Sequence, residues 1–296
     1  MTCQPEKALE LLKVVGSLNR DDPFRDGNLI LLPDYGQVVM TGDFHGCEAN
    51  FHRLKFFADL HRCPQRHVII HELIHINNHD AFSPSCEDRS CRLLLEALEW
   101  KQTFPDQVHF VLGNHDLAQL TGREITKSGA ASIAAFNDWV RQTFGRLGDR
   151  FLDELSLLLS SFALAARCPN RIWLSHSLPG PYATDTFDVT IFEREWQPLD
   201  LLPGGSIYDL VWGRGHTREQ LDRLAEVLDA DFFIVGHQGQ PSGFDCQFER
   251  MIILSSDHSQ GCFMPIDLAK RYHFDELTAR IRYFHQMPTP PEESDV

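Results

Sequence analysis

The sequence of 296 residues has no apolar run of the roughly 18 residues that a membrane-spanning helix needs, so we expect no membrane partner. Its first residues lack the basic stretch and following apolar run of a secretory signal peptide. Its eight cysteines are scattered, and no Cys-x-x-Cys pair occurs. Together these absences predict a cytoplasmic protein with reduced cysteines, used as small core residues.

Positive charge is also scarce. Lys and Arg number 27 against 42 Asp and Glu, which gives a formal net charge of −15. Affinity for the phosphate backbone of nucleic acids depends on clustered Lys and Arg, so we expect no nucleic-acid partner. A phosphorylated substrate is still compatible with this charge, because bound metal ions would supply positive charge locally.

Four apolar runs each end at residues that can bind a metal ion. The first, Val38–Met40, leads through Thr41-Gly42 to Asp43 and His45. On extended backbone, side chains two residues apart point to the same side, so Asp43 and His45 can bind one ion through oxygen and nitrogen. The other runs, 108–112, 171–174 and 232–235, lead to Gly113-Asn114-His115-Asp116, Ser175-His176 and Gly236-His237.

Strands that alternate with helices predict an α/β fold, in which ligands gather beyond the carboxyl ends of the strands. Such a fold would bring together Asp43, His45, Asn114, His115, His176 and His237. Each residue also has a simpler interpretation. Asn114 suits a turn, Asp116 suits a helix N-cap, and a histidine at a strand end is often only a polar residue. The metal-site interpretation depends on the whole ordered set.

This ordered set resembles the calcineurin-like metallophosphoesterases, and most of all their phosphoprotein phosphatase branch. The motifs of that branch run Asp-x-His-Gly, Gly-Asp-x-x-Asp-Arg-Gly, Gly-Asn-His-Asp/Glu, a single His and a late Gly-His. The matches at 42–46 and 113–116 are specific, and the resemblance extends from Val38 to Leu268. It implies an α/β fold of two packed sheets flanked by helices.

The second motif departs from the resemblance. His71-Glu72-Leu73-Ile74-His75 spells His-Glu-x-x-His, which on a helix is the zinc-metalloprotease motif. That hypothesis requires a helix at His71, whereas the β-branched run Val68-Ile69-Ile70 predicts a strand and Asn77-Asn78 are poor helix formers. The extended protease motif also expects a third histidine where Ala81 stands. The metalloprotease is therefore the less favoured hypothesis.

On the phosphoesterase interpretation, Glu72 replaces the aspartate that bridges two metals, with its carboxylate on a stem one methylene longer. His75 replaces the second aspartate of the motif, and His71 replaces a glycine. Asn77 or a neighbour stands where a phosphate-binding arginine is expected. His71 and His75 are either additional ligands or polar residues at a strand end.

The resemblance implies two divalent metal ions, and mixed oxygen and nitrogen ligands suit Mn, Fe or Zn. The implied ligands are Asp43, His45 and Glu72 for one ion, and Glu72, Asn114, His176 and His237 for the other. The metals would activate a water for attack on phosphorus. His115, oriented by Asp116, would protonate the leaving oxygen. Arg214 is the candidate phosphate clamp, with a solvated loop arginine as the alternative.

The rest of the pattern predicts one domain over residues 1–286. Residues 128–161 contain no strand signal, so we expect a helical insert there that caps or flanks the site. A final helix is expected through Phe274, Leu277, Ile281 and Phe284. Residues 287–296 hold three prolines and three acidic residues, a composition typical of a disordered tail.

We therefore predict a metal-dependent phosphoester hydrolase of the Ser/Thr phosphoprotein phosphatase type. Its substrate would be a phosphorylated protein or a small phosphoester. The alternative from another class is a catalytically weakened binding protein on a phosphatase fold. Glu72 distinguishes the two, because only a carboxylate that bridges two metals supports the enzyme.

Overall fold

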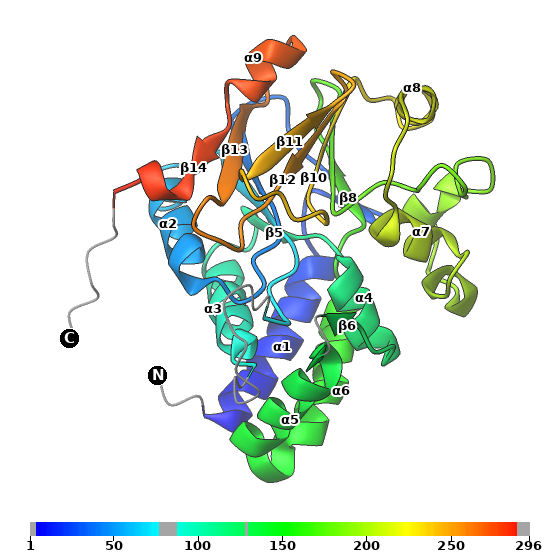
Figure 1. The fold of residues 1–296 in the computed structure, drawn as a ribbon. Helices are drawn as coiled ribbons and strands as arrows, with labels where there is room; N and C mark the ends of the chain where they lie inside the picture. Colours follow the sequence, from blue (N-terminus) through cyan, green and yellow to red (C-terminus); the bar gives the residue numbers. More distant parts are fainter. Residues whose placement is uncertain (1–3, 77–87, 128–129, 289–296) are drawn as a thin grey trace.

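Two mixed β-sheets form the centre of the molecule, in a computed structural model that describes residues 4–76, 88–127 and 130–288 (Figure 1). The larger sheet has the strand order β1-β2-β8-β9-β10-β12-β11, and the smaller has the order β14-β13-β3-β4-β5. The strands of the larger sheet are Arg25–Asp26, Leu29–Leu31, Ala165–Arg167, Ile172–Ser175, Phe232–Val235, Met251–Leu254 and Phe244–Gln247. Those of the smaller are Arg282–Tyr283, Cys262–Asp267, Gln37–Thr41, Arg66–Ile70 and Val108–Phe110.

The sheets share a core because side chains alternate along each strand. Val38 and Met40 of β3 lie in one buried cluster with Ile234 of β10, which belongs to the other sheet. Val39, between them in the sequence, lies in a second cluster that contains the helical side chains. The predicted two-sheet α/β sandwich is therefore confirmed, with one core between the sheets and another beneath the helices.

Helices flank the sheets (Figure 1). The α-helices, α1 to α9, are Pro5–Arg20, Glu48–Ala58, Ser90–Thr103, Asn114–Thr121, Ser132–Phe144, Gly148–Leu159, Ser206–Trp212, Arg218–Val227 and Phe274–Thr278. Short 3-10 helices, η1 to η4, are Gly145–Leu147, Val189–Phe192, Pro198–Leu201 and Phe284–Gln286. Helix α1 packs against α3 and α6, and α5 packs against α6. No helix in the described ranges combines the length and apolar character needed to cross a membrane.

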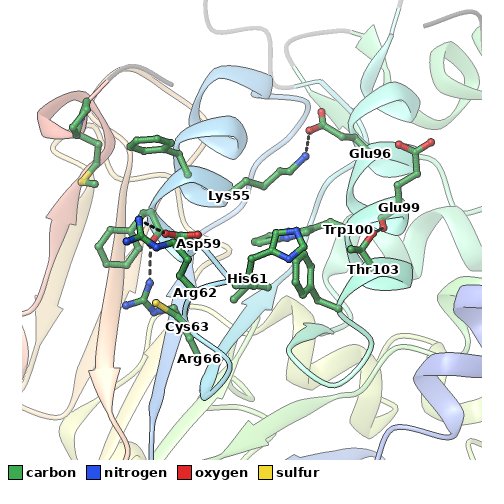
Figure 2. Close-up of a pocket in the computed structure, with 16 residues that line it drawn as sticks. Lys55, Asp59, His61, Arg62, Cys63, Arg66, Glu96, Glu99, Trp100 and Thr103 are labelled. Atoms are coloured by element: carbon green, nitrogen blue, oxygen red, sulfur yellow. Dashed lines mark hydrogen bonds and ion pairs between the residues drawn. The ribbon is translucent and has the colours of Figure 1, made fainter. Parts of the chain in front are cut away.

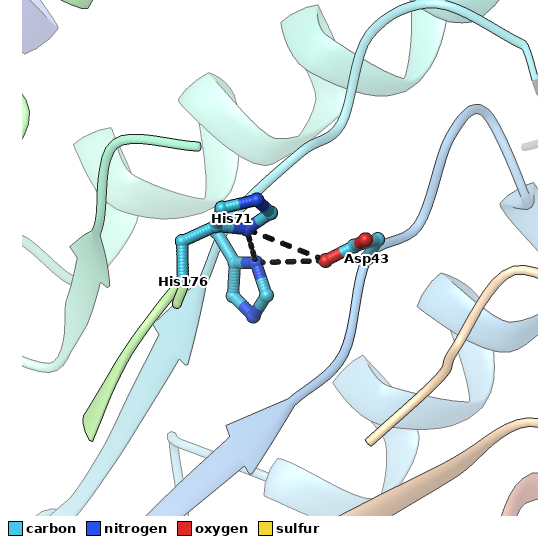
Figure 3. Close-up of side chains that lie close together, drawn as sticks. All are labelled: Asp43, His71 and His176. Carbon is cyan, nitrogen blue, oxygen red and sulfur yellow. Dashed lines mark hydrogen bonds and ion pairs between the residues drawn. The ribbon is translucent and has the colours of Figure 1, made fainter. Parts of the chain in front are cut away.

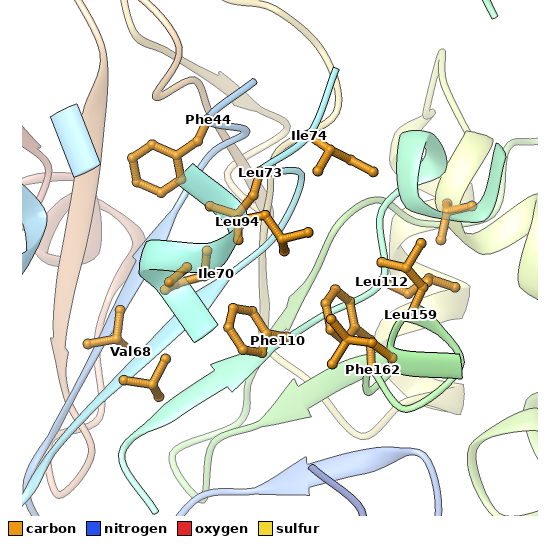
Figure 4. Close-up of a cluster of buried hydrophobic side chains, with 14 of the residues drawn as sticks. Phe44, Val68, Ile70, Leu73, Ile74, Leu94, Phe110, Leu112, Leu159 and Phe162 are labelled. Atoms are coloured by element: carbon orange, nitrogen blue, oxygen red, sulfur yellow. The ribbon is translucent and has the colours of Figure 1, made fainter. Parts of the chain in front are cut away.

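The stretch that follows β4 is a loop, so the metalloprotease hypothesis is wrong. Strand β4 ends at Ile70, and no helix begins at His71. Leu73 and Ile74 are buried in the core beside Phe44 (Figure 4). Because Leu73 and Ile74 are held in the core, the polar residues of the same loop lie at the edge of the sheet.

Two other local predictions differ from the structure, and one helix was not predicted. The expected final helix stops at Thr278, because the chain turns to pair β14 with β13, and Phe284 packs against Phe263. Residues 128–161 do contain helices α5 and α6, but Ala130–Ala131 pairs with Thr126–Lys127 as a two-residue ladder, β7 with β6. Strands of two residues are too short to show the alternation of apolar and polar residues that predicts a strand. The helix without a prediction is α7.

Two predictions fall on residues outside the described ranges. These are the role of Asn77 or its neighbours, and the disorder of the tail 287–296 from residue 289 onward. Of that predicted tail, Met287 is described and packs against the core. The division into a single domain of residues 1–286 stays a prediction.

Candidate metal centre and active site

The loops after five strands bring the predicted ligands to one place. Strands β3, β4 and β5 are parallel neighbours in one sheet, and β9 and β10 are parallel neighbours in the other. Asp43, just after β3, forms a bridge with Ser255, just after β12, which joins the carboxyl edges of the two sheets. The predicted ligands are all buried there: Asp43, His45, Glu72, Asn114, His176 and His237.

Glu72 lies at the centre of this group. Its Oε2 is 3.4 Å from Nε2 of His45, and its Oε1 is 3.7 Å from Nε2 of His176. The backbone N–H of His115 donates to Oε1 at 2.6 Å. Nε2 of His45 also lies 3.9 Å from Oδ2 of Asp43. One carboxylate therefore faces the ligands predicted for both metals, one oxygen toward each.

The second ligand set is tightly clustered. Oδ1 of Asn114 lies 2.8 Å from Nε2 of His176 and 2.7 Å from Nδ1 of His237. The two imidazole nitrogens are 3.0 Å apart. With Oε1 of Glu72 beside them, these atoms form the donor set that was predicted for the second ion.

His71 forms a further group with two predicted ligands (Figure 3). Its Nδ1 lies 3.0 Å from Nδ1 of His176 and 3.1 Å from Oδ1 of Asp43. Its Nε2 lies 2.8 Å from the carbonyl oxygen of Thr41. The sequence left His71 open between a ligand and a polar strand-end residue. Its position next to Glu72 was the only signal of a place at the site.

His75 pairs with the predicted proton donor, His115. Their Nδ1 atoms are 3.1 Å apart, and Nε2 of His75 lies 2.9 Å from Oε1 of Gln119. Asp116, which was expected to orient His115, instead accepts the backbone N–H of Gly113 at 2.9 Å and caps α4. The structure thus places His75, rather than Asp116, against the ring of His115.

Backbone strain and two glycines are concentrated around these side chains. His45, Glu72, His75 and His237 have φ angles of 44°, 50°, 65° and 68°, a region that non-glycine residues rarely adopt and that often marks functional sites. A Cβ on Gly113 would lie 2.2 Å from Oε1 of Glu72. A Cβ on Gly236 would lie 2.4 Å from Cε1 of His71 and 2.5 Å from Oδ1 of Asp43.

Burial controls the charge of the site. It lowers the pKa of His176 well below its usual value, and, together with the charge of Arg214, it lowers the pKa of His237 to about 3. Burial opposes ionisation of Asp43, but the adjoining His176 and His71 hold its pKa well below the usual range. Neutral imidazoles at His176 and His237 and an ionised carboxylate at Asp43 are the protonation states that metal binding requires.

These residues fit two divalent metal ions. Asn114, His176 and His237 bring three potential lone-pair donors within 3.0 Å of one another. When both imidazole nitrogens present lone pairs toward the amide oxygen, the three groups repel one another. A cation bound between them removes that repulsion. A second group that could hold an ion consists of His45, Glu72 and His115.

Arg214 lies near these carboxylates, in the segment between α7 and α8. Partial burial lowers its pKa, and the negative charges of Asp43 and Glu72 act in the opposite direction. The side chain remains exposed to solvent. The guanidinium is thus an accessible cation within the electrostatic reach of the site.

A cavity of about 860 Å³ lies elsewhere, between α2 and α3 (Figure 2). None of the predicted ligands lines it. Two of its charged groups, Lys55 and Glu96, pair with each other at 2.6 Å. The chemistry predicted from the sequence is therefore at the joined sheet edges.

A buried set of carboxylate, amide and imidazole groups at the joined edges of two mixed sheets defines a metal-binding hydrolase site. The chain belongs to the calcineurin-like phosphoesterase family, whose model matches residues 36–241. It is accordingly a phosphoester-hydrolysing enzyme of a family that uses divalent metals. Among curated proteins, no relative matches the sequence.

Solved structures share the fold at low sequence identity. A protein serine/threonine phosphatase from Saccharomyces cerevisiae superposes with a TM-score of 0.68 at 14% identity, covering 98% of this chain and 92% of that one. A cold-active protein tyrosine phosphatase superposes with a TM-score of 0.59 at 13% identity, covering 85% and 78%. The cold-active enzyme of a psychrophilic Shewanella species gives 0.58 at 13% identity, covering 86% and 80%.

Proposed function

We propose that the chain is a metal-dependent phosphomonoesterase of the Ser/Thr phosphoprotein phosphatase type. The observation that carries this proposal is the position of Glu72, whose two oxygens face His45 and His176 at 3.4 and 3.7 Å. A glutamate in this position can serve both halves of a two-metal site, as the aspartate of the family motif does. The superposition with the yeast serine/threonine phosphatase along almost the whole chain supports the substrate class.

The residues divide into two ligand sets and two groups that act on the substrate. Asp43, His45 and Glu72 would hold one ion, and Glu72, Asn114, His176 and His237 would hold the other. Two bound divalent cations supply an acidified water and neutralise charge that develops on the phosphoryl oxygens. Mn, Fe and Zn all suit this donor set.

Arg214 would bind the phosphate through paired N–H donors, since its guanidinium is accessible and near the site. His115 would donate its ring proton to the leaving oxygen. His75, which contacts the other ring nitrogen of His115, would hold that ring in place. Asp116 contributes the cap of α4, which fixes the backbone that carries Asn114 and His115.

The test is hydrolysis of p-nitrophenyl phosphate with added Mn²⁺, measured beside the metal content per chain. We expect turnover that requires metal, two ions per native chain, and loss of turnover by at least about a hundredfold in Asp43→Asn and Glu72→Ala. Asp138→Asn, an exposed acid on α5, is the matched control and should keep full activity. No turnover with one ion or none bound would favour the binding-protein alternative.

A second candidate substrate is phosphotyrosine, and one observation favours it. The ring of Tyr208 stacks on Trp212 at 5.7 Å, and Trp212 meets the His237 ring edge-on at 6.1 Å. An aromatic surface beside a ligand suits an aryl leaving group. Matched peptides that carry phosphoserine, phosphothreonine or phosphotyrosine distinguish the candidates. A preference for phosphotyrosine that Trp212→Ala abolishes would replace the Ser/Thr assignment.

A further inference from the structure

We propose that His216 is a positioning residue for the phosphate clamp. It fastens the loop that carries Arg214, residues 213–216, to the stretch of chain that follows the predicted ligand His176. The inference rests on the proposed function, in which Arg214 binds the phosphate, and it adds a residue that the sequence pattern did not single out. Contacts on both sides of Arg214 carry it.

The position of Arg214 depends on its backbone. The side chain is exposed, and in the part of the chain that the structure describes its guanidinium makes no hydrogen bond or ion pair. The carboxylates of Asp43 and Glu72 act on it through their charge alone. The loop 213–216 therefore sets where this cation lies relative to the site.

On the N-terminal side of Arg214, the loop packs tightly against the chain that follows His176. Oγ of Ser177 donates to the carbonyl oxygen of Gly213 at 2.8 Å. A Cβ on Gly213 would lie 1.7 Å from the carbonyl oxygen of Leu178, so no larger residue fits there. These two contacts fix the point at which the loop begins.

On the C-terminal side of Arg214, His216 makes the corresponding contact. Its Nε2 lies 3.1 Å from the same carbonyl oxygen of Leu178, and because a carbonyl oxygen only accepts, the ring donates this hydrogen bond. Within the described chain Nδ1 of His216 has no partner, so the bond to Leu178 is the one hydrogen bond of the ring. His216 is 5% exposed, so water does not readily replace that bond.

Between these two attachments the loop has little packing of its own. Gly215 has a φ angle of 69°, and a Cβ on it would meet no atom within 4 Å. Glycine permits this turn, but it adds no contact that would hold the turn in place. Without the bond from His216, the backbone is free to rotate about Gly215 and to displace the guanidinium of Arg214.

Helix α8, which follows the loop, is attached to the same stretch of chain. Nε2 of the buried Gln220 donates to the carbonyl oxygen of Pro179, the residue after Leu178. His216 lies between the exposed turn at Gly215 and this attached helix. It is therefore the residue through which the position of α8 is passed on to the clamp.

The test is a double-mutant cycle on the full chain, loaded with Mn²⁺ and assayed on p-nitrophenyl phosphate. We expect His216→Ala to raise KM by about 3- to 10-fold, with kcat and metal content nearly unchanged. In the Arg214→Ala background the same substitution should have no further effect, because it acts through that arginine.

Two further variants separate the hydrogen bond from the volume of the ring. His216→Gln places an amide N–H about as far out as Nε2 of the imidazole, so it should recover most of the loss. His216→Asn has a shorter amide that does not reach Leu178, so its KM should equal that of His216→Ala. The comparison of Gln with Asn keeps a polar side chain in the core and does not depend on how well the alanine variant folds.

Asn170→Ala is the matched control. The buried amide of Asn170 also donates to backbone carbonyls, those of Asp267 and Lys270 at 3.0 and 2.8 Å, but it lies at the opposite end of β9 from His176. The native KM should persist in this variant. A rise in KM as large as that of His216→Ala would overturn the inference, because any loosened loop would then have the same effect.

Three other results would also overturn the role of His216. The first is an unchanged KM in His216→Ala. The second is a rise in KM that persists at full size in the Arg214→Ala background, since His216 would then act on the fold and not on the clamp. The third is a loss of bound metal that matches the loss of activity.

Binding of inorganic phosphate to the Mn²⁺-loaded chain, measured by calorimetry, gives the same cycle without turnover. A chain that hydrolyses no phosphoester, but in which Arg214→Ala and His216→Ala weaken phosphate binding non-additively, contradicts the proposed function and supports the role of His216. A chain that hydrolyses phosphoesters with additive effects supports the function and overturns that role. A chain that binds no phosphate overturns the role as well.

Discussion

Glu72 and His115 are joined by a hydrogen bond of 2.6 Å from the backbone N–H of His115 to Oε1 of Glu72. This bond connects the loop after β4 to the first turn of α4. Gly113 packs so closely that a Cβ there would lie 2.2 Å from the same oxygen. In this chain the backbone around Gly113 and His115 therefore contacts the carboxylate at the reach of a glutamate side chain.

Glu72→Asp should consequently weaken the enzyme, although it restores the residue of the motif. The shorter stem withdraws the carboxylate from His45, from His176 and from the N–H of His115. We expect metal affinity to fall about 10-fold or more, with a matching loss of turnover at low Mn²⁺. Calorimetric titration and aryl phosphate kinetics measure both effects.

Glu124→Asp is the matched control for this change, because Glu124 also accepts a backbone N–H, from Ile133 at 2.9 Å. It should leave metal affinity unaltered. Equal or greater affinity in Glu72→Asp would show that the longer side chain has no role in the fit.

Substitution of His115 or His75 should lower kcat more for some leaving groups than for others. A proton donor matters most when the leaving oxygen is strongly basic. His115→Ala should thus reduce kcat by about 10²- to 10⁴-fold on an alkyl phosphate and much less on p-nitrophenyl phosphate. His75→Phe should also reduce kcat more on the alkyl phosphate, but by a smaller factor, because it disturbs only the position of His115.

Metal content is the control for the histidine variants. Since His115 is also placed beside His45 and Glu72, each variant is measured at saturating Mn²⁺ with its bound metal counted. An equal loss on both substrates, together with a lost ion, would identify His115 as a metal ligand instead of a proton donor.

Arg214→Ala should raise KM for phosphate esters and leave the metal content unchanged. A hydrogen bond to a charged group contributes about 1.5–3 kcal/mol, which corresponds to about a 10- to 100-fold rise. Arg214→Lys should recover part of the loss through charge alone. Arg218→Ala, an exposed arginine over the Phe248 ring, is the control and should keep the native KM. A native KM in Arg214→Ala would place the phosphate clamp elsewhere.

A buried polar network at the opposite end of β4 and β5 should make the fold sensitive to acid. Asp22 accepts hydrogen bonds from Lys101 at 2.9 Å and from Nδ1 of His109 at 2.8 Å, and Nε2 of His109 lies 3.0 Å from Nδ1 of His67. Burial, with the charge of His109, lowers the pKa of His67 to about 3. Burial opposes ionisation of Asp22, but His109 and Lys101 lower its pKa.

Both pKa shifts make the folded chain less stable at low pH. In the folded chain His67 has a pKa of about 3, whereas in an unfolded chain its pKa is about 6.5. The contribution of neutral His67 to the free energy of unfolding is therefore complete above pH 6.5 and is lost as the pH falls toward 3. The lowered pKa of Asp22 acts in the same direction at lower pH. The free energy of unfolding should decline from pH 6.5 to 4. His67→Phe should reduce that slope by up to about 1.4 kcal/mol per pH unit, measured by urea unfolding. An unchanged slope would assign the acid sensitivity to other groups.

Local patterns in the sequence determined the elements that carry the site. The apolar runs before Asp43, Asn114, His176 and His237 predicted strands, and the rule that ligands gather at carboxyl ends predicted a shared edge. These features depend on short stretches of chain, in which side-chain alternation and turn residues are visible. The same reasoning rejected a helix at His71, because β-branched residues precede it.

Tertiary structure decided which side chains meet. His71 pairs with His176 across 105 residues, and His75 pairs with His115 across 40. Tertiary packing also placed His75, instead of Asp116, beside the ring of His115. It ended the last helix early, where β14 pairs with β13. The physical reason is that hydrogen-bond partners are selected by how two sheets and their loops pack. A one-dimensional pattern records which groups reach the edge of a sheet, but not which of them lie within 3 Å of one another.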